Sequence, residues 1–143
     1  MKTETKARLI KHLSFLEVEL NDRVLVNDLS WDEYNTDRVK RRHVERWVEN
    51  VVNSSIDIAR IVLTTENLPV PDTYKEVVVS LSLVTVFDRE TCERMARHVR
   101  LRNILTHEYL DIRWASIRRF IDEADQLYAR LVADTKAYLA ANE

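Results

Sequence analysis

The chain has 143 residues, and its formal net charge of −2 does not by itself indicate a nucleic-acid-binding protein. It contains no glycine, two prolines and a single cysteine. Without glycine the common glycine-rich phosphate loops cannot form, and turns that need positive φ angles are disfavoured. A single cysteine excludes an intrachain disulfide. The composition therefore predicts one all-α domain over residues 1–143.

Two helices are predicted in the N-terminal part. The first is expected over about residues 5–26, with one apolar stripe formed by Leu9, Leu13, Leu16, Leu20 and Val24. Ser30, followed three residues later by Glu33, has the spacing of a capping box and predicts the start of a second helix. Apolar residues then recur at helical spacing from Val39 onward, so this second helix is expected to be long.

A linker is predicted at residues 64–72, which contain both prolines. Thr73 and Glu76 repeat the capping-box spacing and predict a third helix that ends at about Leu83. The β-branched stretch EVVVSLSLVTVF could instead form a strand. A helix is favoured because a single strand without a partner would leave its backbone groups unpaired.

Two more helices are predicted in the remaining sequence. Asp88 can cap a fourth helix that ends at about Glu108 or Tyr109, and Asp111 can cap a fifth with apolar periodicity to Leu139. Together the elements predict an antiparallel bundle of about five helices.

No targeting or membrane segment is recognisable in the sequence. The apolar runs are far shorter than the roughly 20 residues that cross a bilayer, and the N-terminal residues lack the apolar run of a signal peptide. We therefore expect a soluble protein in the cytoplasm, with no membrane partner.

Charge is distributed unevenly along the chain. Residues 17–37 carry seven acidic side chains and one basic side chain. Two later segments are basic and contain Arg38, Lys40, Arg41, Arg42 and Arg46, and then Arg94, Arg97, Arg100 and Arg102. Such runs often form only a solvated face, so an anionic partner is a hypothesis at this point.

The segment RHVRLRNILTHEYLD, residues 97–111, concentrates polar side chains within a predicted helix. At about 100° per residue, five of them share one arc: Arg102, Asn103, Thr106, His107 and Tyr109. The opposite arc is expected to face the core and contains Leu101, Ile104 and Leu105. A guanidinium holds phosphate, an imidazole can move a proton near neutral pH, and an amide can orient either group. These groups are typical of a ribonuclease.

The string R-N-x-x-x-H-x-Y, present as Arg102, Asn103, His107 and Tyr109, resembles the signature of the HEPN superfamily, and specifically of HepT-like toxins. The stretches RRHVERWVENVVNSSIDIAR and PDTY resemble the family's second helix and its linker. Thr106 stands where an aliphatic residue is expected. The resemblance implies a homodimeric HEPN-type helical bundle that acts as a metal-independent RNA endonuclease. It also implies a toxin–antitoxin system whose antitoxin is a MntA-like nucleotidyltransferase.

On this interpretation, His107 is the candidate base for the 2′-hydroxyl of RNA, and Arg102 stabilises charge on the phosphate. Asn103 orients one of these groups. Because Arg102 and His107 lie roughly 140° apart on one helix, a two-fold dimer would help to bring two motifs into one cleft. The resemblance also implies that the antitoxin AMPylates Tyr109.

Basic residues outside the motif are expected to contact the RNA backbone: Arg38, Arg41, Arg42, Arg97 and Arg100. No metal site is expected, because no two of the four histidines are spaced i, i+4 and no Cys/His cluster accompanies them. No cofactor is expected.

Two other interpretations stay open on the sequence alone. The chain could be a non-catalytic HEPN module that presents Tyr109 or a nucleotide site to a nucleotidyltransferase. It could also be a plain helical interaction domain whose polar face has no chemical role.

Overall fold

All regular structure is helical in residues 1–142, which the computed structural model describes. The α-helices are α1 (Thr3–Asn21), α2 (Trp31–Thr36), α3 (Arg38–Thr65), α4 (Tyr74–Ser80), α5 (Arg89–His98), α6 (Leu101–His107) and α7 (Leu110–Ala141). Short 3₁₀ turns follow α1 (Asp22–Leu25) and α4 (Leu81–Leu83). The expected all-α bundle is confirmed.

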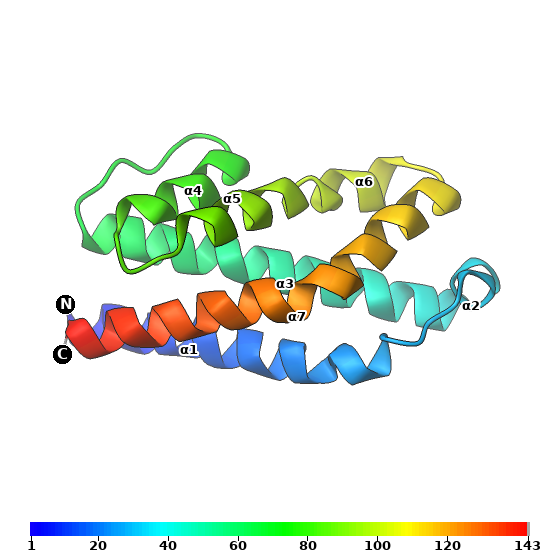
Figure 1. Ribbon diagram of the computed structural model, residues 1–143, viewed down its shortest axis with the longest axis horizontal. Coiled ribbons are helices and arrows are strands. Elements are labelled where there is room, and N and C mark those ends of the chain that lie inside the picture. The colour runs from blue at the N-terminus through cyan, green and yellow to red at the C-terminus, as the bar shows by residue number, and fades with distance from the viewer. Residues whose placement is uncertain (143) are drawn as a thin grey trace.

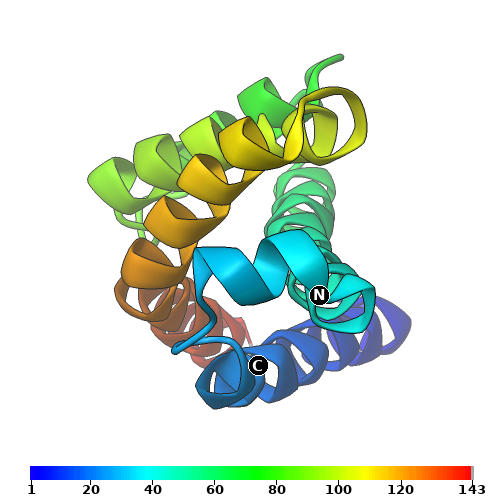
Figure 2. The ribbon, with the colours of Figure 1, turned by 90° about the vertical axis from the view of Figure 1, so that its right-hand side faces the viewer.

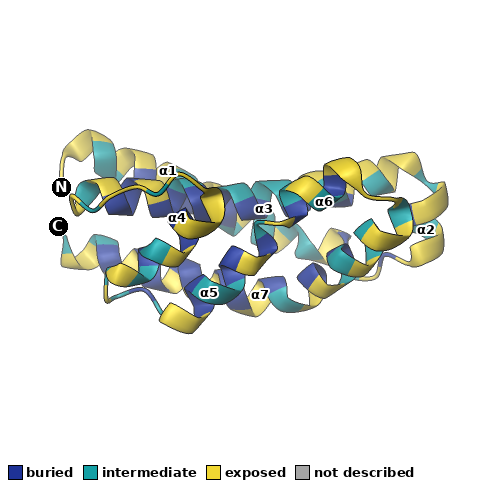
Figure 3. Ribbon diagram, turned by 90° about the horizontal axis from the view of Figure 1, so that it is seen from above, coloured by how far each residue is buried: buried dark blue, intermediate teal, exposed yellow. Residues whose placement is uncertain are grey.

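The long helices α3 and α7 run in one direction, and α1 and the α5–α6 pair run in the other (Figure 1). Viewed along the bundle, α1 lies on the opposite side from α5 and α6, and α3 and α7 pass between them (Figure 2). Helix α3 packs against α1, α4 and α7 and contributes more buried residues than any other described helix. Buried residues line the inward faces of all the long helices (Figure 3).

Helix α1 contributes only part of its expected apolar stripe to the core. Leu9, Leu13 and Leu16 are buried, but the side chain of Val24 is 76% exposed. The α-helix ends at Asn21 and the chain tightens into a 3₁₀ turn, which rotates Val24 out of the stripe. The prediction for Val24 was wrong for this reason.

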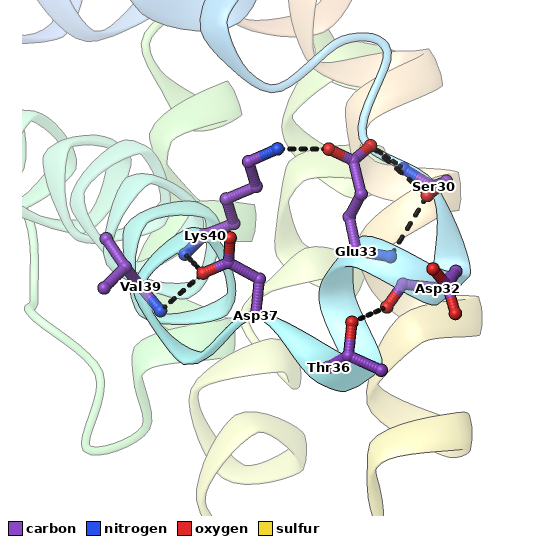
Figure 4. Close-up of polar contacts among 7 residues, drawn as sticks. All are labelled: Ser30, Asp32, Glu33, Thr36, Asp37, Val39 and Lys40. Atoms are coloured by element: carbon purple, nitrogen blue, oxygen red, sulfur yellow. Dashed lines mark hydrogen bonds and ion pairs between the residues drawn. The ribbon is translucent and has the colours of Figure 1, made fainter.

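The second predicted helix is divided into α2 and α3 at Asp37. The capping box is present, because the Ser30 hydroxyl accepts from the Glu33 amide and the Glu33 carboxylate accepts from the Ser30 amide (Figure 4). Asp37 then has an extended backbone, and its carboxylate accepts from the amides of Val39 and Lys40 at 3.0 and 3.1 Å. Asp37 therefore caps a new helix, and the single long helix that we expected was wrong.

Residues Tyr74–Leu83 are helical and residues 84–87 form bends and turns, so the alternative of a strand is excluded. Thr73 caps α4 by accepting from the Glu76 amide at 3.2 Å. The helix continues as a 3₁₀ turn to Leu83, the predicted end of the third helix. Val77, Val78 and Leu81 are buried, which accounts for the apolar content of this segment.

The predicted fourth helix is interrupted between α5 and α6. Asp88 caps α5 as expected, but the chain turns at Val99 and Arg100, and around this turn the amides of Val99, Arg102 and Asn103 bond three residues back rather than four. The expected cap of the last helix was also wrong. Tyr109 occupies the cap position of α7 without a side-chain bond, and Asp111 lies inside the first turn. The two interruptions, here and at Asp37, turn five expected helices into seven.

The single cysteine, Cys92, is fully buried in α5. Burial, followed by the nearby carboxylates of Asp134 and Asp88, raises the pKa of its thiol to about 12. The thiol therefore packs as a small apolar group rather than acting as a nucleophile.

In the described part of the chain, no helix combines the length and the apolar character needed to span a bilayer.

Candidate active site

Helix α6 presents a small polar surface, as the helical wheel predicts. Its buried side chains are Leu101 and Leu105, and its exposed ones are Asn103, Thr106 and His107. The Thr106 hydroxyl donates to the carbonyl of Arg102 at 3.0 Å, so this residue uses its polar group within the helix. The amide of Asn103 and the imidazole of His107 face outward.

The guanidinium of Arg102 lies on an aromatic ring from another helix. Its Cζ is 4.4 Å from the ring centroid of Tyr74, the first residue of α4, and Cζ of Arg60 from α3 is 4.9 Å from the same centroid. Hydrogen bonding to Arg60 and then to Arg102, together with their positive charge, lowers the pKa of the Tyr74 hydroxyl. Three helices thus place two guanidinium groups around one partly exposed ring, and the ring restrains Arg102 without neutralising it.

Arg102 and His107 lie at the two ends of α6. Arg102 is half-buried and held at Tyr74, whereas His107 is exposed on the last turn. No hydrogen bond joins their side chains within the described residues. One protomer therefore presents the two groups at opposite ends of one short helix and does not join them directly.

Tyr109 follows α6 and stands outside it. Its side chain is 83% exposed, and its carbonyl accepts from the amide of Arg113 in the first turn of α7. The wheel placed Tyr109 on the same arc as Arg102, but that geometry assumed a helix that continued past His107. The helix ends at His107, so the predicted angle of Tyr109 was wrong.

A set of polar contacts fixes the turn between α6 and α7. Arg113 donates from Nε to the carbonyl of Glu108 at 2.7 Å and from Nη1 to the carboxylate of Glu45 in α3 at 3.3 Å. The same carboxylate accepts from the hydroxyl of Tyr34 in α2. Burial and this carboxylate raise the pKa of Tyr34. The turn that carries Tyr109 is thereby bound to α2 and α3.

The predicted backbone-binding arginines have different surroundings. Arg38 and Arg42 are exposed near the start of α3. Arg41 is half-buried, and its Nη1 donates to the carbonyls of Tyr34 and Asn35 at 3.1 and 3.0 Å, so it closes the end of α2. Arg97 and Arg100 are exposed at the end of α5 and at the following turn.

Sequence reasoning did not identify Tyr74 and Arg60 as neighbours of Arg102, nor the role of Glu45 and Arg113 at the turn. Tyr74 was noted only as part of the PDTY stretch. Each of these contacts joins residues on different helices, and no local spacing predicts them.

Within residues 1–142, no three His, Cys, Asp or Glu side chains are placed so that they could hold a metal ion.

A family model described as "Ribonuclease HepT-like" matches residues 7–133. The chain belongs to the HepT-like family. The matched range runs from the first turns of α1 through most of α7, and it includes Arg102, Asn103, His107 and Tyr109. The fold is accordingly a HEPN-type helical bundle. No curated protein matches this HepT-like chain.

Proposed function

We propose that this HepT-like protein is a toxin that cleaves RNA without a metal ion. The observation that carries the proposal is the polar surface of α6, which exposes the imidazole of His107 and the amide of Asn103 beside the restrained guanidinium of Arg102. The family to which the chain belongs is described as a ribonuclease family. RNA supplies its own nucleophile, the 2′-hydroxyl, so this set of groups suffices for the reaction.

In the proposed reaction His107 removes the proton of the 2′-hydroxyl. The 2′ oxygen forms a bond to the adjacent phosphorus, and the bond from phosphorus to the 5′ oxygen of the next nucleotide breaks. The leaving oxygen takes up a proton from solvent water, which gives a 2′,3′-cyclic phosphate and a 5′-hydroxyl. Arg102 stabilises the charge that develops on the phosphate oxygens, and Asn103 orients His107 or the phosphate.

The active unit in this proposal is a symmetric homodimer. Because one protomer does not close Arg102 and His107 around one point, two copies of α6 facing each other across a two-fold axis would complete the cleft. Exposed apolar side chains on α2 and on the first turn of α7 could add to such a contact. Ile112 is exposed on the first turn of α7, and the exposed Trp31 packs on Trp114 with ring centroids 6.5 Å apart.

Tyr109 is the proposed site of inactivation. Its exposed hydroxyl is accessible to a MntA-like nucleotidyltransferase, which would transfer AMP from ATP to the phenolic oxygen and release pyrophosphate. The added phosphate is negative and bulky, so it would compete with RNA at the cleft. The two proteins would form a toxin–antitoxin pair in the cytoplasm.

Cleavage of RNA by the purified chain in the presence of a chelator tests the activity. Wild type is expected to cleave, and His107→Ala is expected to lose at least about a hundredfold in rate, because general base catalysis contributes about that much or more. His43→Ala is the matched control, since His43 is exposed on α3 and has no role in the proposal. Equal rates for wild type and His107→Ala would refute the assignment.

The exposure of Tyr109 outside α6 also fits a second candidate, a non-catalytic HEPN module that only presents this residue to a nucleotidyltransferase. Expression of the chain alone separates the two. A toxin arrests growth and His107→Ala relieves the arrest, whereas a module has no effect on growth in either form.

A further inference from the structure

A hollow of about 490 Å³ lies between α4, α5, α6 and α7, and Arg102 is not among the residues that line it. Five basic side chains line it: Lys75, Arg94, Arg97, Arg100 and Arg119. We call this set the basic hollow. Its cations come from three helices and one turn that are separate in the sequence, so the fold brings them together.

None of the five side chains has an ion pair or a hydrogen bond to another described residue. The only carboxylate in the lining is that of Glu123, which is bonded to Nε2 of the buried His98 at 2.8 Å. Burial, assisted by the charges of Arg94 and Arg119 and opposed by Glu123, lowers the pKa of His98. In a chain whose net charge is −2, this concentration of unpaired positive charge favours binding of an anionic ligand.

The chemistry of the basic hollow fits phosphate groups. Four of its five cations are arginines, whose planar donors match phosphate oxygens. Arg94 and Arg97 are one helical turn apart, and Arg119 reaches the same space from α7, so several phosphates in a row can be contacted at once.

The position of the basic hollow connects it to the candidate active site. Lys75 directly follows Tyr74, whose ring holds Arg102, and Arg100 immediately precedes α6. A strand that crosses the first turn of α6 can therefore contact both the basic hollow and Arg102.

We propose that the basic hollow binds the sugar-phosphate backbone of the RNA strand next to the phosphate that is cleaved. This inference rests on the proposed ribonuclease function and adds a second binding site to it. Contacts of this kind position a strand without reading its sequence.

The test measures binding of a fluorescein-labelled single-stranded RNA of about 20 nucleotides to the full chain by anisotropy, over a range of salt concentrations. All proteins carry His107→Ala so that the RNA stays intact. The test variant adds Arg94→Gln, Arg97→Gln and Arg119→Gln. The matched control instead adds Lys2→Gln just before α1 and Arg8→Gln and Lys11→Gln on α1, a helix that lies across the bundle from α5 and α6 (Figure 2).

The test variant is expected to bind RNA at least about tenfold more weakly at physiological salt, and its log–log salt slope should fall by about 2, because three single-strand phosphate contacts are lost. The control is expected to keep the affinity and slope of its parent. Thermal melting checks that both variants fold, and none of the six substituted side chains has a hydrogen-bond or ion-pair partner among the described residues. Unchanged binding by the test variant, or equal losses in the test and control variants, would overturn the proposal.

Inorganic tripolyphosphate, added at matched ionic strength, distinguishes an RNA backbone from a free polyphosphate. Weak competition is expected, and displacement of RNA at micromolar concentrations would overturn the proposal in favour of a nucleotide-like ligand.

Cleavage assays without His107→Ala separate this inference from the proposed function. If wild type cleaves and the three arginine substitutions leave RNA affinity unchanged, only this inference fails. If RNA binds through the basic hollow but wild type does not cleave, only the ribonuclease proposal fails.

Discussion

The start of α3 and the basic hollow carry similar numbers of cations but use them differently. At the start of α3, Lys40 pairs with Glu33, Arg46 approaches Glu49, and Arg41 donates to the carbonyls that end α2. In the basic hollow no cation has a partner among the described residues. The difference comes from the acids within reach, because the one carboxylate in the basic hollow already accepts from His98. A count of charges in a segment therefore does not tell which of them are available to a ligand.

The largest change in stability is expected at Glu45, because its carboxylate is the least exposed of the ion-paired acidic groups near the start of α3. Glu45→Gln should lower the free energy of unfolding by about 2 kcal/mol, because it leaves the guanidinium of Arg113 and the hydroxyl of Tyr34 without their shared carboxylate. Urea denaturation measures this loss. Glu49→Gln is the control, since its pair with Arg46 is exposed and should contribute at most about 0.5 kcal/mol. Equal losses would mean that the Glu45 contacts do not stabilise the turn.

A direct comparison of the two clusters uses one arginine from each. Arg41→Ala should cost about 1 kcal/mol of stability, because it removes two hydrogen bonds to the carbonyls at the end of α2. Arg97→Ala should change stability by less than about 0.5 kcal/mol, because its side chain has no described partner. Denaturant midpoints measured in parallel check both values. If Arg97→Ala proves the more destabilising of the two, the distinction between the clusters is wrong.

Arg102 is intermediate between the paired cations at the start of α3 and the unpaired cations of the basic hollow, because Tyr74 restrains it without removing its charge. If the chain cleaves RNA as proposed, Tyr74→Ala should lower kcat/KM about two- to fivefold, the equivalent of one exposed cation–π contact. Tyr74→Phe keeps the ring and should stay close to wild type. Cleavage rates under single-turnover conditions give this comparison. An equal loss in both variants would assign the effect to the hydroxyl instead of the ring.

The smallest effect concerns the buried histidine of the basic hollow. Because the pKa of His98 is lowered in the folded state, the unfolded chain binds a proton near pH 6.5 that the folded chain does not bind. Stability should therefore decline as the pH falls below about 6.5. The difference between wild type and His98→Gln in urea denaturation, measured from about pH 7.5 to about pH 5.5, isolates this contribution from the other histidines. Parallel pH profiles for the two proteins would contradict it.

Much of the fold could be predicted from local sequence, because the helix starts are encoded within a few residues. Ser30 with Glu33, Thr73 with Glu76, and Asp88 all cap helices where their spacing indicates. The interruption at Asp37 was also encoded, but the apolar periodicity that continues from Val39 concealed it. The turn at Val99 and Arg100 has no glycine or proline to mark it, so local sequence gave no reason to expect two helices there.

The candidate site was predictable only as far as one helix determines it. The outward face of α6 follows from the positions of Leu101 and Leu105, which are buried as expected. The ring of Tyr74 under Arg102 and the carboxylate of Glu45 beside Arg113 depend on how separate helices pack. Helical spacing carries no information about such pairs. Whether Arg97 and Arg100 are free of protein partners, and so able to contact a ligand, depends on packing in the same way.

The burial of Cys92 has a practical consequence for testing the proposed homodimer. Since its thiol is enclosed and has a pKa of about 12, the native chain should be inert to maleimide and methanethiosulfonate reagents. A nitroxide attached through Asn103→Cys would then be the only paramagnetic label on each copy. Electron–electron distances from pulsed spectroscopy would report directly how far apart two α6 surfaces lie in solution.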